Sequence, residues 1–244
     1  MTDDMENAII MASGMGTRMR PLTETTPKPL IKVLGRPMVE TVIEGLEKRG
    51  VDNIFVVVGY LGDQFGYLTE KYPNVEIIRN DAYETVNNIS SVYFAREVLR
   101  KGDCFICEAD LYAADKDLFC NAPDHSCYYG KMVEGHSDDW VFDLNDEGLI
   151  TRVGKVGDDR YNMTGVAFFK AADAAVLADA IEEAFGAPGY EDLFWDDVVD
   201  RNLDKLRLRV HPVAHDSIVE IDTPQELEEV NKLFGGKNES SCYR

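Results

Sequence analysis

The segment best suited to chemistry lies near the amino terminus, where a short apolar run is followed by a glycine-rich turn. Residues 8–12 are apolar and predict a buried strand. Gly14 and Gly16 then allow the backbone to turn and to approach a ligand closely. Successive backbone N–H groups in such a turn form a concavity that binds anions. Arg18 adds a planar guanidinium that can donate two parallel hydrogen bonds, and Lys28 adds a compact positive charge. The segment is therefore typical of a polyphosphate site.

The charge distribution along the chain supports an anionic ligand at this turn. The formal net charge is −20, yet residues 17–36 contain five basic residues and one acid, Glu24. A basic strip on an acidic protein favours anion binding there, although a chance surface cluster would have the same composition. The turn is not a Walker A loop, which needs Gly-Lys-Ser/Thr. It is not the dinucleotide fingerprint either, whose third glycine is replaced by Met19.

Two aspartates that follow short apolar runs are candidate metal ligands. Asp110 comes shortly after the run 103–108, and Asp222 follows the run 218–221. Mg²⁺ prefers one or two carboxylates together with phosphate oxygens. Mg²⁺ is therefore the expected metal, although either aspartate alone could equally be a helix cap or a solvated loop acid.

Magnesium beside arginine and lysine indicates phosphoryl chemistry that works by positioning and charge neutralisation. We expect an acceptor phosphate oxygen to attack the α-phosphorus of a nucleoside triphosphate, with pyrophosphate leaving. Arg18 would neutralise the pyrophosphate, and Lys28 would hold the α-phosphate or the acceptor phosphate. The backbone that would cradle the triphosphate comprises Gly14, Met15, Gly16 and Thr17. A phosphate monoester is already anionic at neutral pH and needs no general base, which fits the lack of a convincing Ser-His-Asp or Cys-His arrangement in the sequence.

A second group of residues combines aromatic and acidic side chains. Tyr190, Trp195 and Asp196 lie in one segment, and Trp140 directly follows two aspartates at 138 and 139. Aromatic faces with nearby carboxylates favour a quaternary ammonium ligand. The competing interpretation is that Trp195 is simply a core residue of a helix.

The elements that would position these groups alternate between strands and helices through the first half of the chain. Strands are predicted at 7–12, 53–58, 75–79 and 103–108, and helices at 38–49, 63–71 and 89–100. This alternation predicts an α/β fold with a Rossmann-like, mostly parallel twisted sheet covered by helices. Ligands bind beyond the carboxyl ends of such strands, where the glycine turn and Asp110 both fall.

The second half has a mixed pattern and is expected to supply the acceptor site. Strands are predicted at 126–133, 139–144, 150–153, 161–170, 206–212 and 218–221, and helices at 171–184 and 192–202. Thr223 is a candidate cap for a final helix, with Pro224 at its first position. We therefore expect a single domain over residues 1–236 and a disordered tail over residues 237–244.

Composition excludes several classes of protein. The strong net negative charge argues against nonspecific nucleic-acid binding, and no apolar stretch is long enough for a transmembrane helix. The acidic amino terminus does not resemble a signal peptide, so a cytoplasmic location is expected. Cys104 and Cys107 have a metal-like spacing, but they lie in a predicted buried strand and are expected to be core thiols. The sequence predicts no oligomeric state.

The amino-terminal string as a whole resembles a known family signature. Residues 12–18, followed by Pro-Leu-Thr at 21–23 and Pro-Lys at 27–28, are similar to the motif of nucleotidyltransferases that make sugar nucleotides and CDP-alcohols. Ser13 departs from the usual alanine, which is a small-for-small change. The resemblance implies that Asp110 and Asp222 are the family's metal-binding aspartates.

Further segments resemble the bacterial phosphocholine cytidylyltransferases over most of the chain, from Ala8 to about Leu233. They are Val58-Gly59-Tyr60, Asn87-Asn88-Ile89-Ser90-Ser91-Val92, Trp195-Asp196 and Glu220-Ile221-Asp222. The likeness implies CTP as donor and phosphocholine as acceptor, with CDP-choline as product. The implied nucleotide contacts are Ala12, Gly14, Met15, Gly16, Thr17, Arg18, Asn87, Asn88 and Ser91. The implied acceptor contacts are Trp140, Tyr190, Trp195, Asp196 and Glu220.

Three alternatives to phosphocholine activation stay open. The same subfamily includes enzymes that activate 2-aminoethylphosphonate, whose primary ammonium prefers carboxylates to an all-aromatic cage. A sugar-1-phosphate nucleotidyltransferase is a less favoured enzyme, since sugars are recognised by dense hydrogen bonding. A non-catalytic nucleotide-binding regulator is disfavoured because such a module need not keep both metal acids.

Overall fold

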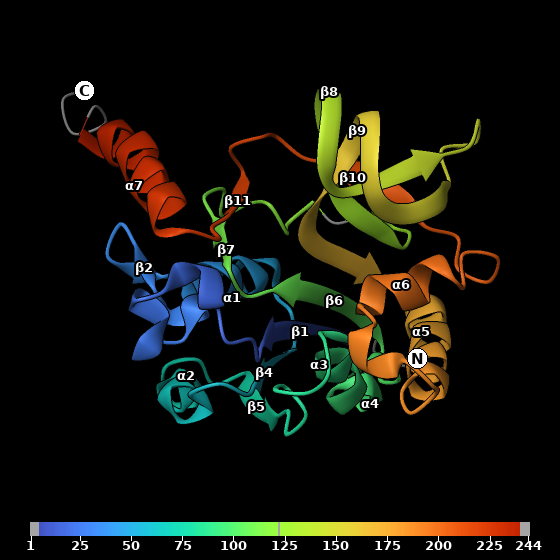
Figure 1. Cartoon of the computed structure of the whole chain (residues 1–244), viewed down its shortest axis with the longest axis horizontal. Helices are drawn as coiled ribbons and strands as arrows, with labels where there is room; N and C mark the ends of the chain where they lie inside the picture. Colours follow the sequence, from blue (N-terminus) through green and yellow to red (C-terminus); the bar gives the residue numbers. More distant parts are fainter. Residues whose placement is uncertain (1–4, 122, 240–244) are drawn as a thin grey trace.

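The computed structural model describes residues 5–121 and 123–239, and a seven-stranded sheet forms its centre (Figure 1). The strand order is β10-β8-β9-β6-β1-β4-β5. The strands are β1 (Glu6–Ala12), β4 (Asn53–Val58), β5 (Val75–Arg79), β6 (Asp103–Glu108), β8 (Cys127–Leu144), β9 (Ile150–Phe169) and β10 (Arg209–Pro212). β1, β4, β5 and β6 pair in parallel, whereas β9 is antiparallel to both β6 and β8. The predicted Rossmann-like α/β fold with a mixed second half is confirmed.

Helices cover both faces of this sheet. The helices are α1 (Met38–Arg49), α2 (Tyr67–Lys71), α3 (Ile89–Phe94), α4 (Arg96–Leu99), α5 (Ala171–Ala184), α6 (Trp195–Asp200) and α7 (Pro224–Glu239). In the central strand β1, Ile10 packs into the core beneath α1, while its neighbour Ile9 packs into the core beneath α3 and α5. This alternation follows from the two-residue repeat of a strand that is buried on both sides.

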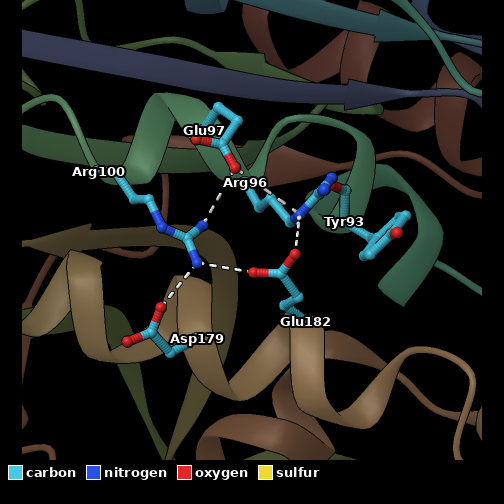
Figure 2. Close-up of polar contacts among 6 residues, drawn as sticks. All are labelled: Tyr93, Arg96, Glu97, Arg100, Asp179 and Glu182. Carbon is cyan, nitrogen blue, oxygen red and sulfur yellow. Dashed lines mark hydrogen bonds and ion pairs between the residues drawn. The ribbon is translucent and has the colours of Figure 1, made fainter.

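Ion pairs fasten α4 to α5 on one face of the sheet (Figure 2). Arg100 contacts Asp179 at 2.7 Å and Glu182 at 2.8 Å, and Arg96 contacts the same Glu182 at 3.3 Å. The Arg96 guanidinium also lies 4.2 Å from the ring centre of Tyr93. These contacts hold the two helices against each other.

The main difference from the predicted elements concerns the second half. The four strands predicted between 126 and 170 are two long strands, β8 and β9, that form one bent hairpin. Their pairing shifts repeatedly, so that Val141 pairs with both Gly154 and Asn162. The stretches between the predicted strands 126–133 and 139–144, and between 150–153 and 161–170, are bulged strand, because bulges keep the pairing while the hairpin bends.

Several predicted helices are shorter or longer in the structure. The helix predicted at 89–100 is divided at Ala95 into α3 and α4, and the helix predicted at 192–202 is the short α6 after a 3₁₀ turn, Tyr190–Asp192. α7 continues through residues 237–239, which were predicted as tail, whereas residues 240–244 lie outside the described part. No helix among the described residues has both the length and the apolar character that spanning a membrane requires.

Two small sheets complete the fold. β2 (Lys32–Val33) pairs with β3 (Arg36–Pro37), and β7 (Leu111–Ala113) pairs antiparallel with β11 (Ile218–Glu220). The second pairing matters for function, because it brings the segment after β6 beside the segment that leads into α7.

Candidate active site

A cleft of about 620 Å³ lies over the carboxyl ends of β1 and β6 and reaches β8, β9 and the start of α6. One part of its wall comes from the glycine turn and from α3. The other part comes from the β8–β9 hairpin and from Phe194. The cleft therefore joins the two halves that the sequence assigns to nucleotide and acceptor.

Of the two glycines in the turn, only Gly16 has a backbone conformation that favours glycine. Gly16 has a φ of 61°, and a Cβ added there would lie 2.8 Å from the Cβ of Lys28. At Gly14, a Cβ would meet no atom within 4 Å. Gly16 thus lets the turn pack against Lys28, while Gly14 leaves its backbone open to a ligand.

Lys28 connects the two predicted metal aspartates. Its Nζ lies 2.6 Å from Asp110 Oδ2 and 2.5 Å from Asp222 Oδ1, and Arg18 Nη2 lies 2.7 Å from the same Asp222 oxygen. Burial removes water from the Lys28 ammonium, but the carboxylates of Asp110 and Asp222 outweigh that loss and raise its pKa. The four residues predicted to be catalytic are therefore in direct contact.

The start of α7 fixes Asp222. Glu226 Oε2 accepts hydrogen bonds from the backbone N–H of Asp222 at 2.7 Å and of Thr223 at 2.9 Å. In return, the backbone N–H of Glu226 donates to Thr223 Oγ1 at 3.2 Å. This reciprocal capping box confirms Thr223 as the helix cap and orients the aspartate before it.

Carboxylates gather beside Lys28 in a set that suits a divalent cation. Oxygens of Glu108, Asp110 and Glu220 lie within 4.8 Å of one another. Asp110 Oδ1 is buried and has no hydrogen-bond partner among the described residues, so an oxygen is left for a metal. An all-oxygen donor set of this kind matches the preference of Mg²⁺.

Two glutamates of this set have perturbed acidity. Burial, followed by the charges of Asp110 and Glu220, raises the pKa of Glu108 well above its ordinary value. Loss of hydration in the cleft, followed by the charge of Asp110, raises the pKa of Glu220 to about 8. Glu108 was not predicted as a site residue. Its spacing from Asp110 could have identified it. Side chains two residues apart at the end of a strand, such as those of Glu108 and Asp110, point to the same side.

Asn87, Asn88 and Ser91 line the cleft, as do Ala12, Gly14, Gly16 and Thr17. Two of them also make contacts across the fold. The backbone N–H of Asn87 donates to Glu191 O at 2.8 Å, and Asn88 Oδ1 accepts from the backbone N–H of Trp195 at 3.0 Å. The predicted nucleotide side thus holds the loop that leads into the acceptor side.

The hydroxyl of Ser13 has partners of its own. It donates to Val57 O at 3.1 Å and accepts from Ser91 Oγ at 3.2 Å. Met15 is 40% exposed and does not contribute to the cleft wall of the described structure.

Three of the predicted acceptor residues are not in the cleft wall of the described structure. Trp195 is 3% exposed and stacks on Tyr128 at 5.7 Å between ring centres. Asp196 is 2% exposed and accepts a hydrogen bond from the Tyr128 hydroxyl at 3.0 Å, and burial raises its pKa to about 7. Tyr190 packs on Phe185 at 4.8 Å. The interpretation of Trp195 as a core residue is correct, because α6 begins at that residue and turns it inward.

Other residues take their place in the acceptor wall. Trp140, which was predicted to bind the acceptor, lines the cleft, and Phe194 meets its ring edge-on at 5.4 Å between centres. Asp138, Asp139 and Lys155 complete this part of the wall. Glu220, also predicted to bind the acceptor, lies in the cleft beside Glu108 and Asp110.

A glycine turn, a lysine and two aspartates gathered over the carboxyl ends of parallel strands suit a nucleoside triphosphate. The chain belongs to the nucleotidyl transferase family, whose family model matches residues 7–127. The chain is 53% identical over 221 residues to the 2-aminoethylphosphonate cytidylyltransferase of Lancefieldella rimae, covering 91% of this chain and 90% of that protein.

The chain is also similar, over nearly its whole length, to a relative that is named for phosphocholine. Identity to the choline-phosphate cytidylyltransferase of Streptococcus pneumoniae is 34% over 231 residues, with 95% and 99% coverage. The solved CTP:phosphocholine cytidylyltransferase structure from that organism superposes with a TM-score of 0.87 at 33% identity, covering 94% of this chain and 99% of that one. The expected membership of the nucleotidyltransferases is confirmed.

Proposed function

We propose that this protein transfers CMP from CTP to a small acceptor that carries a phosphate or phosphonate at one end and an ammonium at the other. The observation that carries the proposal is the cleft itself. Its glycine turn and Lys28 suit a triphosphate, and its opposite wall presents Trp140 and Phe194 beside two aspartates. The named cytidylyltransferase relatives support CTP as the donor.

In the proposed reaction, an acceptor oxygen forms a bond to the α-phosphorus of CTP on the face opposite the β-phosphate. The bond from the α-phosphorus to the bridging oxygen breaks, and pyrophosphate leaves with that electron pair. Arg18 stabilises the charge on the leaving pyrophosphate, and Lys28 holds the α-phosphate and the attacking oxygen together.

Mg²⁺ is the metal we propose, held by Asp110 and Asp222 with Glu108 and Glu220 nearby. When bound, it would neutralise phosphate charge and orient the triphosphate. Because CTP is an intracellular nucleotide, we place the reaction in the cytoplasm.

Two acceptors fit the proposal. Phosphocholine is the acceptor expected from the sequence, and the pneumococcal relative and its structure support it. 2-Aminoethylphosphonate is supported by the relative at 53% identity. The chemistry of the wall also favours it, because Trp195 and Tyr190 are directed elsewhere and leave two rings beside Asp138 and Asp139. Carboxylates next to a partial aromatic wall suit a primary ammonium that donates hydrogen bonds.

The test is pyrophosphate release with CTP and Mg²⁺, comparing phosphocholine, 2-aminoethylphosphonate, phosphoethanolamine and glucose-1-phosphate in parallel. Turnover with the first or the second compound supports cytidylyl transfer and identifies the acceptor. Turnover with the sugar phosphate alone would replace the proposal by a sugar-nucleotide synthesis. Binding of CTP without pyrophosphate release from any acceptor would indicate a nucleotide-binding regulator.

A further inference from the structure

Lys155 occupies the aromatic corner of the acceptor wall. It lies on β9 directly opposite Trp140 of β8, so the hairpin pairing places the two side chains together. Its Nζ lies 5.5 Å from the ring centre of Trp140 and 5.3 Å from that of Phe194. Both distances are within the range of a cation–π interaction. A primary alkylammonium therefore already sits where the proposed acceptor would place its own.

The contacts of Lys155 are weak enough for its ammonium to leave the two rings. Among the described residues its ammonium makes no ion pair within 4.0 Å, although Asp138 and Asp139 belong to the same wall. The residue is exposed, and a lysine stem is long and flexible. Swinging the ammonium into solvent costs only the two ring contacts, which at an exposed site amount to about two- to fivefold in affinity.

Resting on the proposed function, we propose that Lys155 is the resident cation of the acceptor-ammonium subsite. In the free enzyme its ammonium covers Trp140 and Phe194, and the ammonium of the acceptor displaces it on binding. Lys155 therefore weakens acceptor affinity through competition for the rings and through like-charge repulsion. It has no role in holding CTP or in the transfer step. The subsite accepts a primary ammonium in the same place, which matches 2-aminoethylphosphonate more closely than an ion that cannot donate hydrogen bonds.

The experiment compares acceptor KM, CTP KM and kcat for wild type, Lys155→Ala and Lys155→Gln. Both variants remove the charge, and the glutamine keeps most of the stem in case alanine disturbs the hairpin. The expected result is an acceptor KM lower by about two- to fivefold, with CTP KM and kcat unchanged. Ethylammonium chloride, used as a competitive inhibitor against the acceptor, should inhibit both variants more strongly than wild type by a similar factor. Lys155→Arg keeps the cation and should retain the wild-type KM.

Lys101 provides a matched control. Its Nζ lies 5.7 Å from the ring centre of Phe55, and it is not part of the cleft wall of the described structure. Lys101→Ala removes the same charge and the same kind of ring contact, and it should leave all three kinetic constants unchanged.

Two outcomes would overturn the proposal. A raised acceptor KM in Lys155→Ala and Lys155→Gln would mean that Lys155 binds the acid group of the acceptor. An unchanged KM and unchanged ethylammonium inhibition would mean that the acceptor ammonium lies elsewhere. Both differ from failure of the proposed function, in which wild type itself would turn over neither ammonium acceptor.

Discussion

At the scale of single residues, Lys28 connects parts of the chain that are far apart in sequence. Its contacts with Asp110 and Asp222 span 82 and 194 positions, yet all three side chains meet at one end of the cleft. The lysine lies between two carboxylates that would otherwise repel each other. On the proposed function, we expect the charges at this point to matter for activity.

Asp110→Asn should reduce turnover by at least about a hundredfold, because it removes a charged group from the centre that we propose neutralises phosphate charge. The amide has the same shape, so CTP binding measured by calorimetry should persist. Asp204→Asn is the control, because Asp204 is an exposed aspartate outside the cleft wall of the described structure. Retained pyrophosphate release in Asp110→Asn would exclude Asp110 from the chemistry.

The two glycines of the turn should respond differently to alanine. Gly16→Ala forces a side chain into a left-handed backbone against Lys28, and we expect a loss of about 1–3 kcal/mol in urea unfolding. Gly14→Ala should leave stability within about 0.5 kcal/mol and raise the KM for CTP, since the new methyl faces open space in the cleft. If CTP KM were unchanged in Gly14→Ala, the triphosphate would not lie against this turn.

The residues of the nucleotide end were predictable because their motif is local in sequence. Gly14, Gly16, Arg18 and Lys28 lie within fifteen positions, directly after the first strand. Phe194 and Lys155 were not predicted, because only tertiary pairing makes them neighbours. Nothing in the local pattern distinguishes Phe194, which faces the cleft, from Trp195, which faces the core, until the first residue of α6 is known.

At the scale of elements, the strands at 53–58 and 103–108, which are buried on both faces, were predicted with their observed bounds, and so was the edge strand at 75–79. In the two buried strands, a run of apolar residues carries the signal. The bent hairpin of β8 and β9 was not predicted as two strands. Its bulges are set by which residues pair across it, and that information is not local.

The start of α6 depends on one side chain from the nucleotide side. Asn88→Ala removes the acceptor for the Trp195 N–H and should destabilise the protein by about 0.5–2 kcal/mol. Phe194 of the cleft wall directly precedes Trp195, so loss of this bond should loosen its ring. The acceptor KM should therefore rise more than the CTP KM. Asn88→Asp keeps an acceptor oxygen and should restore most of the stability. An unaffected acceptor KM in Asn88→Ala would show that Asn88 does not position this wall.

Glu40 of α1 makes stability depend on acid pH. Its carboxylate is buried and accepts hydrogen bonds from Lys71 at 2.5 Å and Tyr67 at 2.8 Å. Burial alone would raise the pKa, but these bonds outweigh it and lower the pKa below its ordinary value of 4.5. The stabilisation is thus complete above that value and is lost as pH falls through the lowered pKa.

Glu40→Gln should cost about 1–3 kcal/mol at pH 7 and flatten the acid limb of a urea-unfolding profile between pH 7 and pH 3. Glu47→Gln, on the same helix, should keep the wild-type profile. A Glu40→Gln profile parallel to wild type would assign the acid sensitivity to other carboxylates.

At the scale of the whole molecule, the cleft is built by both halves of the chain and exists only when they are folded together. A ligand that binds there stabilises the folded state by mass action. CTP with Mg²⁺ at a hundred times its Kd should add about 2.7 kcal/mol and raise Tm by about 5–10 °C. Arg18→Gln, at a side chain that is 67% exposed, should shrink this shift with little effect on the Tm of the free protein. A shift of equal size in Arg18→Gln would remove Arg18 from the nucleotide site.

The distance along the chain between Lys28 and Asp222 also has a consequence during synthesis. A ribosome adds about 5–20 residues each second, so the 194 positions between them take about 10–40 s to translate. Throughout that interval the Asp222 carboxylate that contacts Lys28 does not yet exist. On the proposed function, each newly made molecule therefore could not consume CTP until the first residues of α7 have emerged and packed.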